Sequence, residues 1–244
     1  MSGEPLRFLS WNLAMLERSA EAPLYWDASA TEAQVRETVL DLEPDVVLYQ
    51  ELPGIVPFVE THSMLPAQAC SHSGNIATLV ANQHLDDQPQ VKALDGCAVL
   101  ATFAEPELTI ANVHLVSGRG AASDRLAQVA EIIDASPTEA LLIVGDTNMR
   151  VAEADSLIDL GLRGEKPPAA TWDSQRNRFR PGAAEFSAYF TRWFASPNVG
   201  VSNVVVHQEP VEHNDHKFFL SDHYAISGSV TLTDASQQDL QTSL

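Results

Sequence analysis

The fold prediction begins with one stretch, Leu-Leu-Ile-Val-Gly-Asp-Thr-Asn, at residues 141–148. The apolar run from Leu141 to Val144 predicts a short buried strand that ends at Gly145. An acid and an amide, Asp146 and Asn148, follow at once. Taken alone, Asp146 is typical of a turn, because aspartate side chains bond the backbone of the residues that follow. The stretch becomes informative because the same combination occurs at other strand ends.

Acidic, amide and imidazole side chains interrupt or flank four further apolar runs. They are Asn12 in the predicted strand 6–14, Glu51 after 45–49, Asn112 and His114 in 108–116, and Asp222 and His223 before 224–232. A lone buried carboxylate or amide is costly unless it is paired or ligates a metal. Strand ends of a sandwich converge on one rim, so we expect these side chains to face one another there.

The rest of the chain predicts short strands and two helices. The helices span Thr31 to Leu42, with Thr31 as the N-cap, and about Ala121 to Ile133. Further strands are expected at 76–81, 98–103 and 204–207, and 98–103 forms a hairpin with 108–116. Residues 167–203 are rich in turns and aromatic residues. This mixture predicts one α/β sandwich domain over residues 1–232, followed by a polar C-terminal tail at 233–244.

The charge balance restricts the partners of the chain. It has 33 acidic and 14 basic residues, for a net charge of -19. Nucleic-acid-binding proteins usually carry a basic stripe, so this balance disfavours tight binding to long DNA. It does not disfavour a divalent cation or a short phosphorylated end. No apolar run approaches the roughly 18 residues of a membrane span. No secretory signal is visible either, so the sequence predicts an intracellular, cytoplasmic protein or one whose sequence is already processed.

Together, the polar segments resemble the endonuclease/exonuclease/phosphatase superfamily, the DNase I-like proteins. The matching segments, in the family's order, are Ser10–Asn12, Asp45–Glu51, Ala111–Leu115, Arg125–Gln128, Leu142–Asn148 and Ser221–His223. No single segment is specific, but the ordered combination spans almost the whole chain. The resemblance implies a four-layered α/β sandwich. Its two central, mostly antiparallel sheets would be flanked by helices, with a metal site at one edge.

A closer likeness lies at residues 170–177, Ala-Thr-Trp-Asp-Ser-Gln-Arg-Asn. This segment resembles the Thr-Trp-Asp segment of tyrosyl-DNA 5′-phosphodiesterases. That subgroup places an Arg-x-Asp-Arg-Ile-Phe strand further on, and its best counterpart here is Tyr-Phe-Thr-Arg-Trp-Phe at 189–194. Thr191 stands where the subgroup has an aspartate. This difference is expected to alter how the final histidine, His223, is oriented.

The resemblance implies a role for each polar residue. Glu51 would be the carboxylate ligand of Mg²⁺, for which Mn²⁺ can substitute, and Asn12 a neutral oxygen ligand or a water-positioning amide. Mg²⁺ favours one or two carboxylates and keeps several waters, which suits so sparse a set. The implied catalytic residues are Asp146 and Asn148 at the attacking water, His114 and His223 at the phosphoryl oxygens, and Asp222 beside His223 or the metal.

Three residues are expected on the substrate side of this site. Trp172 is either a substrate wall or a packed core aromatic, and the sequence does not decide between them. Arg119, between two glycines in a loop, is a candidate phosphate contact. Asn112 lies two residues before His114 on the same strand face, and it is expected behind His114. Arg125 and Gln128 share a helix face and are predicted to tie that helix to neighbouring loops.

These residues predict a Mg²⁺-dependent phosphodiesterase that hydrolyses its ester by in-line attack of an activated water. The substrate is expected to be a nucleic-acid end, such as a 5′-phosphate that carries an adduct, as in DNA repair. One alternative is a small-molecule phosphoesterase acting on a phospholipid head group, an inositol phosphate or a nucleotide. Another is a non-catalytic module that binds phosphate. Nothing in the sequence indicates a protein partner.

Overall fold

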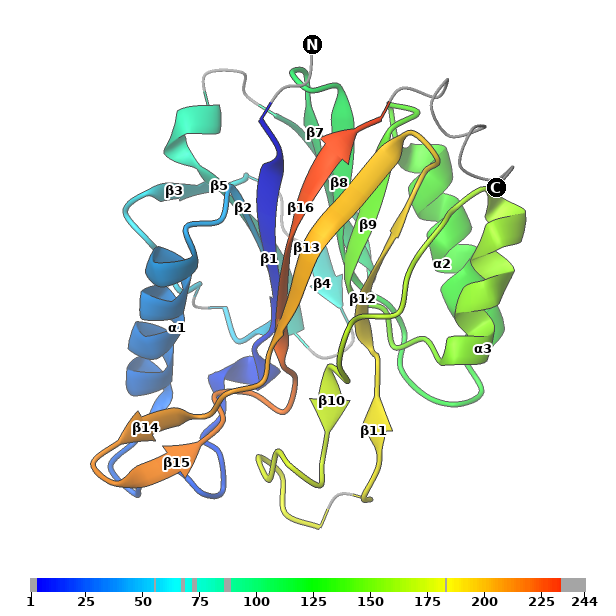
Figure 1. The fold of residues 1–244 in the computed structure, drawn as a ribbon. Helices are drawn as coiled ribbons and strands as arrows, with labels where there is room; N and C mark the ends of the chain where they lie inside the picture. The colour runs from blue at the N-terminus through cyan, green and yellow to red at the C-terminus, as the bar shows by residue number, and fades with distance from the viewer. Residues whose placement is uncertain are drawn as a thin grey trace.

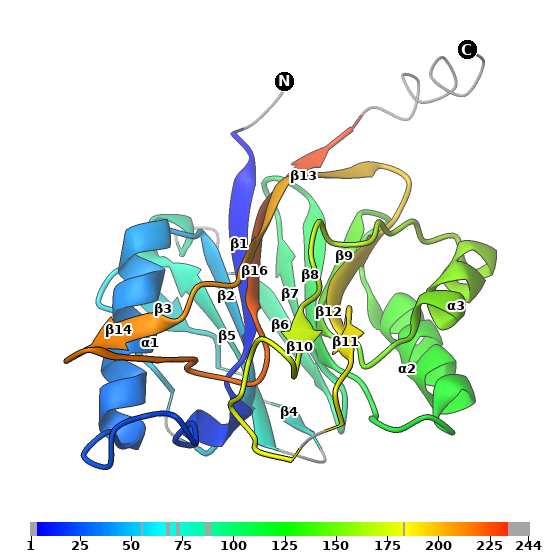
Figure 2. The same ribbon diagram turned by 60° about the horizontal axis from the view of Figure 1, so that its bottom comes forward.

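A computed structural model describes residues 4–54, 56–66, 69–71, 74–85, 89–182 and 184–233. Its described strands form two large sheets that face each other, with helices on their outer sides (Figures 1 and 2). The seven-stranded sheet contains, in order, β13 (Val199–His207), β16 (Ala225–Leu232), β1 (Leu6–Asn12), β2 (Val46–Leu52), β5 (Gly74–Ala81) and β3 (His62–Met64), and β4 (Ala69–Ser71) also pairs with β5. The five-stranded sheet contains β12 (Thr191–Ala195), β9 (Leu141–Asp146), β8 (Leu108–His114), β7 (Ala98–Phe103) and β6 (Gln90–Leu94).

Smaller elements complete the layers. The α-helices are α1 (Ala28–Leu42), α2 (Ala122–Ala135) and α3 (Val151–Ala154). Short 3₁₀ segments lie at η1 (Ala14–Leu16), η2 (Asn82–His84) and η3 (Asp155–Leu160). Two small hairpins project from the sandwich, β10 (Trp172–Asp173) with β11 (Ser187–Ala188), and β14 (Val211–His213) with β15 (His216–Phe218). None of the described helices is long and apolar enough to cross a membrane.

Each large sheet contains one parallel pair of described strands, and its other described pairs are antiparallel. The parallel pairs are β1 with β2 and β8 with β9, joined through α1 and α2 respectively. Parallel neighbours end at the same edge of a sheet. The carboxyl ends of these four strands therefore place Asn12, Glu51, His114 and Asp146 at one end of the sandwich, the lower edge in Figure 1.

The continuous apolar runs follow from burial on both faces of each sheet. Phe8 and Leu48 pack between the two sheets, against residues such as Leu142. The next residue along each strand points to the other face of the sheet, toward the outer layer, where Leu9 packs with Val39 of α1. Strands covered on both faces lose the apolar–polar alternation of a half-exposed strand. The predicted α/β sandwich with mostly antiparallel central sheets is confirmed.

Several predicted boundaries were wrong. The helix α1 begins at Ala28, and Asp27 is its N-cap because its carboxylate accepts from the amide of Ala30 at 3.0 Å. Residues 167–203, predicted to be turns, contain β12 and the start of β13. Gly145 does not end β9, which runs through it to Asp146. Of the predicted tail, only residue 233 is described, and the rest lies outside the described residues.

Gly145 lets β9 continue because it packs directly on β8. Its φ is +150°, and a Cβ placed there would collide with the backbone of Val113 on the paired strand. We expect Gly145→Ala to lower the free energy of unfolding by about 2–4 kcal/mol, from backbone strain and strand separation. Urea denaturation would measure the change. Gly120→Ala is the control, because its Cβ would meet no atom within 4 Å. Equal stability of the two variants would contradict this account.

Candidate active site

The candidate site is a cavity of about 650 Å³ at the edge where β1, β2, β8 and β9 end. Most of the residues that line it carry polar side chains. They are Met15, Glu17, Glu51, Gly74, His114, Ser117, Asp146, Asn148, Arg180, Asp222 and His223. The cavity therefore contains six of the ten residues that the sequence assigns to the site, and a seventh, Asn12, contacts Asp146 from beneath.

Two carboxylates and two imidazoles form the centre of the cavity. The Nε2 atom of His114 lies 3.6 Å from Glu51 Oε1 and 3.6 Å from Asp146 Oδ2. His223 approaches from the opposite sheet, with its Nε2 atom also 3.6 Å from Asp146 Oδ2. One ligand atom each from Glu51, His114 and Asp146 lies within 4.8 Å of the others. Among the described residues, this trio is the group with the spacing to hold a metal ion.

Asp146 is the most buried acid of the site, with 1% of its surface exposed. The Nδ2 atom of Asn12 donates to its Oδ2 at 2.9 Å, and the backbone amide of Asn148 donates to its Oδ1 at 3.1 Å. Burial alone would raise the pKa of Asp146, but the charges of His223 and His114 and these two hydrogen bonds lower it below its usual value. The group is therefore a carboxylate at neutral pH, suited to bind a cation or accept a proton.

The backbone around the cavity adopts unusual conformations. Glu51 has a φ of +52°, and the pairing of β2 with β5 shifts register between Tyr49 and Leu52. A bulge of this kind re-aims a side chain out of the strand alternation. Asn148 has a φ of +51°, and the three residues of η1 also have positive φ values. Such strained non-glycine residues cluster at functional sites, because the surrounding structure must hold them in place.

The fold can be compared with known structures. No family model matches the chain, and no curated protein matches it in sequence. TDP2 from D. rerio, complexed with single-strand DNA product, aligns with a TM-score of 0.71 at 18% identity over 93% of this chain and 99% of that one. TDP2 from C. elegans aligns with a TM-score of 0.67 at 19% identity over 96% of this chain and 76% of that one. An endonuclease/exonuclease/phosphatase family protein from Bacteroides thetaiotaomicron gives 0.65 at 13% identity over 96% and 100%.

This chain has the endonuclease/exonuclease/phosphatase fold. The likeness confirms the four-layered architecture that the ordered polar segments imply.

The aromatic segment around Trp172 lies beside His223. Trp172 is half-buried, its ring centroid is 4.3 Å from that of Phe186, and its backbone bridges to that of His223. Phe190 lies between the two, 6.2 Å from Trp172 and 6.3 Å from the imidazole of His223. Phe186 remains 44% exposed. These rings form an aromatic cluster next to His223, although none of the three lines the cavity itself.

Thr191 occupies the position where the subgroup has an aspartate. It pairs with Asp146 in the β12–β9 ladder, and its Oγ1 atom lies 3.4 Å from His223 Nδ1. The imidazole of His223 is therefore backed by a hydroxyl group instead of a carboxylate. Asp222 does not take over this role, because its Oδ2 accepts from Arg180 Nε at 2.9 Å. The predicted support of His223 by Asp222 is not seen as a contact.

Asn112 does not line the cavity, and it lies behind His114, as the strand alternation predicts. The side chain is fully buried between the sheets. Its Nδ2 atom donates to the carbonyl oxygens of Tyr49 and Ala77, and its Oδ1 atom accepts from Gln50 Nε2 at 2.8 Å. The strand alternation does place it on the face of His114, but deeper in the sandwich. Asn112 joins β8 to β2 and β5 beneath the bulge that carries Glu51.

Two helix residues have the structural role that their spacing predicts. Arg125 is fully buried, and its Nη1 atom donates to the carbonyl oxygens of Val116 and Gly118, at 2.9 Å each. The Oε1 atom of Gln128 accepts from the amide of Val116 at 3.0 Å. Both residues tie α2 to the loop that follows β8. Arg119 lies in that loop and is exposed to solvent.

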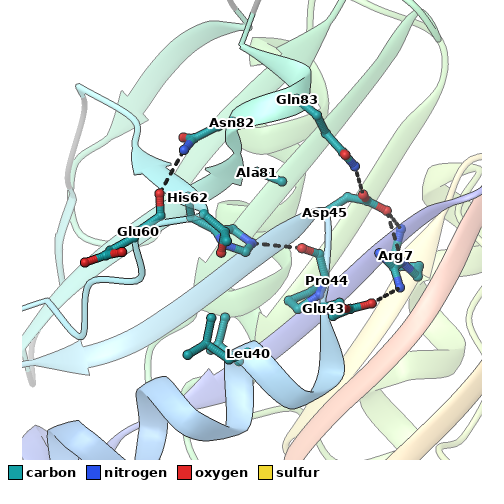
Figure 3. Close-up of a pocket in the computed structure, with 12 residues that line it drawn as sticks. Arg7, Leu40, Glu43, Pro44, Asp45, Glu60, His62, Ala81, Asn82 and Gln83 are labelled. Carbon is teal, nitrogen blue, oxygen red and sulfur yellow. Dashed lines mark hydrogen bonds and ion pairs between the residues drawn. The ribbon is translucent and has the colours of Figure 1, made fainter.

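A second cavity, of about 550 Å³, lies where β1 and β2 begin, at the opposite edge from the candidate site (Figure 3). Its buried polar groups already bond one another. Asp45 accepts from Arg7 and from Gln83, and His62 bonds the carbonyl oxygen of Pro44 (Figure 3). The acids and the histidine that line this second cavity do not form, among the described residues, a group with the spacing to hold a metal ion.

Proposed function

We propose that the chain is a Mg²⁺-dependent phosphodiesterase that acts at a nucleic-acid end, releasing an adduct from a 5′-phosphate. The observation that carries this proposal is the cluster of Glu51, His114, Asp146 and His223 in one cavity of an endonuclease/exonuclease/phosphatase fold. In such a fold, two carboxylates and two imidazoles supply the groups that hydrolysis of a phosphodiester needs.

Glu51 is suited to hold Mg²⁺ as its carboxylate ligand, because it lies close to Asp146 and His114 beside an open cavity that admits water. A bound ion would supply charge to neutralise the phosphoryl oxygens. Asn12 has its Oδ1 atom on the amide of Ala14 and its Nδ2 atom on Asp146, so we propose that it orients the carboxylate or a water. His114 would add an imidazole ligand, which suits a transition-metal ion better than Mg²⁺.

The chain's own residues then perform the displacement. Asp146, ionised and buried, accepts the proton of the attacking water, and Asn148 holds that water in place. His114 and His223 face the space next to Asp146, where they donate hydrogen bonds to the phosphoryl oxygens or a proton to the leaving group. The leaving group lies toward the aromatic cluster around Trp172.

Three observations support a nucleic-acid end as the substrate. The aromatic cluster around Trp172 offers a stacking partner for a base or for a tyrosyl group. D. rerio TDP2, of the same fold, was solved with a single-strand DNA product. The net charge of -19 disfavours long DNA, but a short end needs few cationic contacts.

A substrate panel tests this function. Under one set of conditions, a 5′-phosphotyrosyl oligonucleotide, sphingomyelin, an inositol phosphate and bis-(p-nitrophenyl) phosphate are incubated with Mg²⁺ and then with EDTA. We expect metal-dependent turnover, with the highest kcat/KM on the oligonucleotide. Turnover of sphingomyelin alone would exclude the nucleic-acid substrate. No turnover of any ester would favour a module that only binds phosphate.

Glu51→Gln should raise the Mg²⁺ concentration needed for half-maximal activity by about tenfold or more, because it removes a carboxylate ligand. The amide keeps the shape of the side chain, so the bulge of β2 should persist. Activity is titrated with Mg²⁺ for both proteins. Glu17→Gln is the matched control, because Glu17 lines the same cavity but lies outside the trio of potential ligands. An unchanged metal dependence of Glu51→Gln would exclude Glu51 as a ligand.

A further inference from the structure

Most cations of this acidic chain are neutralised or hydrogen-bonded by the protein itself. Of its 14 lysines and arginines, three have no ion pair, hydrogen bond or ring contact within the described residues. They are Lys92, Arg119 and Arg178. Because 33 acidic residues are available as partners, an arginine side chain that has none of them is a candidate for binding an external anion. Lys92 lies on β6, whereas Arg119 and Arg178 lie in loops next to the candidate site.

Arg178 lines a cavity of about 750 Å³ that adjoins the catalytic one. We call it the arginine cavity, and its lining includes Ser174, Gln175, Arg178, Arg180 and Gly182 from the β10–β11 loop. Arg180 lines both cavities, so they share a wall. Its Nε atom is held on Asp222 at 2.9 Å, and its Nη2 atom lies 3.6 Å from Glu17. The arginine cavity therefore adjoins the candidate-site cavity at Arg180, next to Asp222 and His223.

We propose that the arginine cavity binds the phosphate next to the reacting one in a single-stranded nucleic acid, with Arg178 as its cation. This inference rests on the proposed function and specifies its substrate as a strand longer than one nucleotide. Guanidinium groups match phosphate oxygens with paired donors, and Arg178 has no acidic partner to displace. Arg180, already balanced by Asp222 and Glu17, forms the wall between the two phosphates.

The charges around the arginine cavity limit how much of a strand it holds. Glu21 and Glu185 line it together with Arg178, and Arg180 is already paired with Asp222 and Glu17, so the charge around the cavity is negative overall. We expect one phosphate to bind beside Arg178, and no extended phosphate track. This fits a chain whose net charge of -19 repels long nucleic acid.

Binding of the reaction product tests the inference without turnover. The probe is a 5′-phosphorylated tetranucleotide with a 3′ fluorophore, titrated with the full chain in Mg²⁺ at several salt concentrations. A single-strand phosphate contact contributes about −0.7 to the slope of log K against log[salt]. We expect Arg178→Gln to reduce the slope by about this amount and to weaken binding about 3- to 10-fold at low salt.

Arg176→Gln is the matched control for this test. Arg176 is exposed and lies two residues away, but it pairs with Glu209 at 3.0 Å and does not line the cavity. Its variant should bind the tetranucleotide as the wild type does. Identical salt slopes for Arg178→Gln and the wild type would overturn the inference. A second result would also overturn it. If Arg178→Gln weakened binding only of a 5′-phosphotyrosyl peptide adduct, the cavity would hold the peptide part of the substrate instead of the nucleic acid.

The failure of this inference can be told apart from failure of the proposed function. Hydrolysis of the p-nitrophenyl ester of thymidine 5′-monophosphate, which has no second phosphate, tests the chemistry alone. If the wild type does not hydrolyse this ester, the proposed function fails, whatever the binding results. If it does, and the tetranucleotide binds no more tightly than thymidine 5′-monophosphate, the arginine cavity has no phosphate role.

Discussion

Asp146→Asn should lower kcat by about 10²-fold or more while Mg²⁺ still binds. The carboxylate is fully buried, and nearby imidazoles and hydrogen bonds hold its pKa below the usual value. An amide in its place cannot accept the proton of an attacking water. It would also present a donor where Asn12 Nδ2 already donates, at 2.9 Å, so the hydrogen bond between the two would be lost or inverted.

Turnover of the 5′-phosphotyrosyl oligonucleotide at saturating Mg²⁺ measures the loss, and calorimetric titration measures metal binding. Asp45→Asn is the matched control, because Asp45 is another buried aspartate but lies at the opposite edge of the sandwich. That variant should keep its kcat. If Asp146→Asn retains full activity, its assignment as the base fails. If activity returns at higher Mg²⁺ concentrations, Asp146 acts mainly as a metal ligand.

The sequence predicts the sandwich well because its central strands are covered on both faces. Continuous runs such as Val46–Leu48 and Leu141–Val144 mark these strands, and polar residues then mark their ends. The strand β12 was indicated only by the family resemblance of residues 189–194, because Arg192 interrupts its apolar character. In the structure that side chain is buried, and its Nε atom donates to the carbonyl oxygen of Tyr189 at 2.7 Å. A buried hydrogen bond between these residues has no local sequence signal.

The site residues that sequence reasoning placed incompletely or missed depend on contacts between distant segments. Asn112 shares the strand alternation of His114, but only the facing sheet decides that it lies in the interior instead of the cavity. Arg180 comes from the β10–β11 loop, 42 positions before its partner Asp222, and nothing local pairs them. Its signal was the run of alternate arginines at 176, 178 and 180. Only the structure shows that Arg176 and Arg180 are paired with acids and that Arg178, within the described residues, is not.

His223→Gln should reduce kcat by about 10²- to 10⁴-fold, the range for loss of a general acid or base. The imidazole is 9% exposed, and its Nε2 atom lies 3.6 Å from Asp146 Oδ2 in the wall of the cavity where the phosphoryl group would bind. Glutamine can still donate a hydrogen bond but cannot carry a proton at neutral pH. The backbone should stay in place, because Trp11 Nε1 bonds the carbonyl oxygen of residue 223 and Ser221 Oγ accepts its amide.

The leaving group separates the two roles left open for His223. If the imidazole donates a proton, His223→Gln should slow a tyrosyl ester far more than a p-nitrophenyl ester, whose leaving group needs no proton. Equal losses on both esters would instead indicate a hydrogen bond to the phosphoryl oxygens. His62→Gln serves as the control, because His62 is buried at the opposite edge and bonds Pro44. The hydroxyl of Thr191 behind Nδ1 can orient the imidazole but brings no negative charge, so it would stabilise an imidazolium less than an aspartate does.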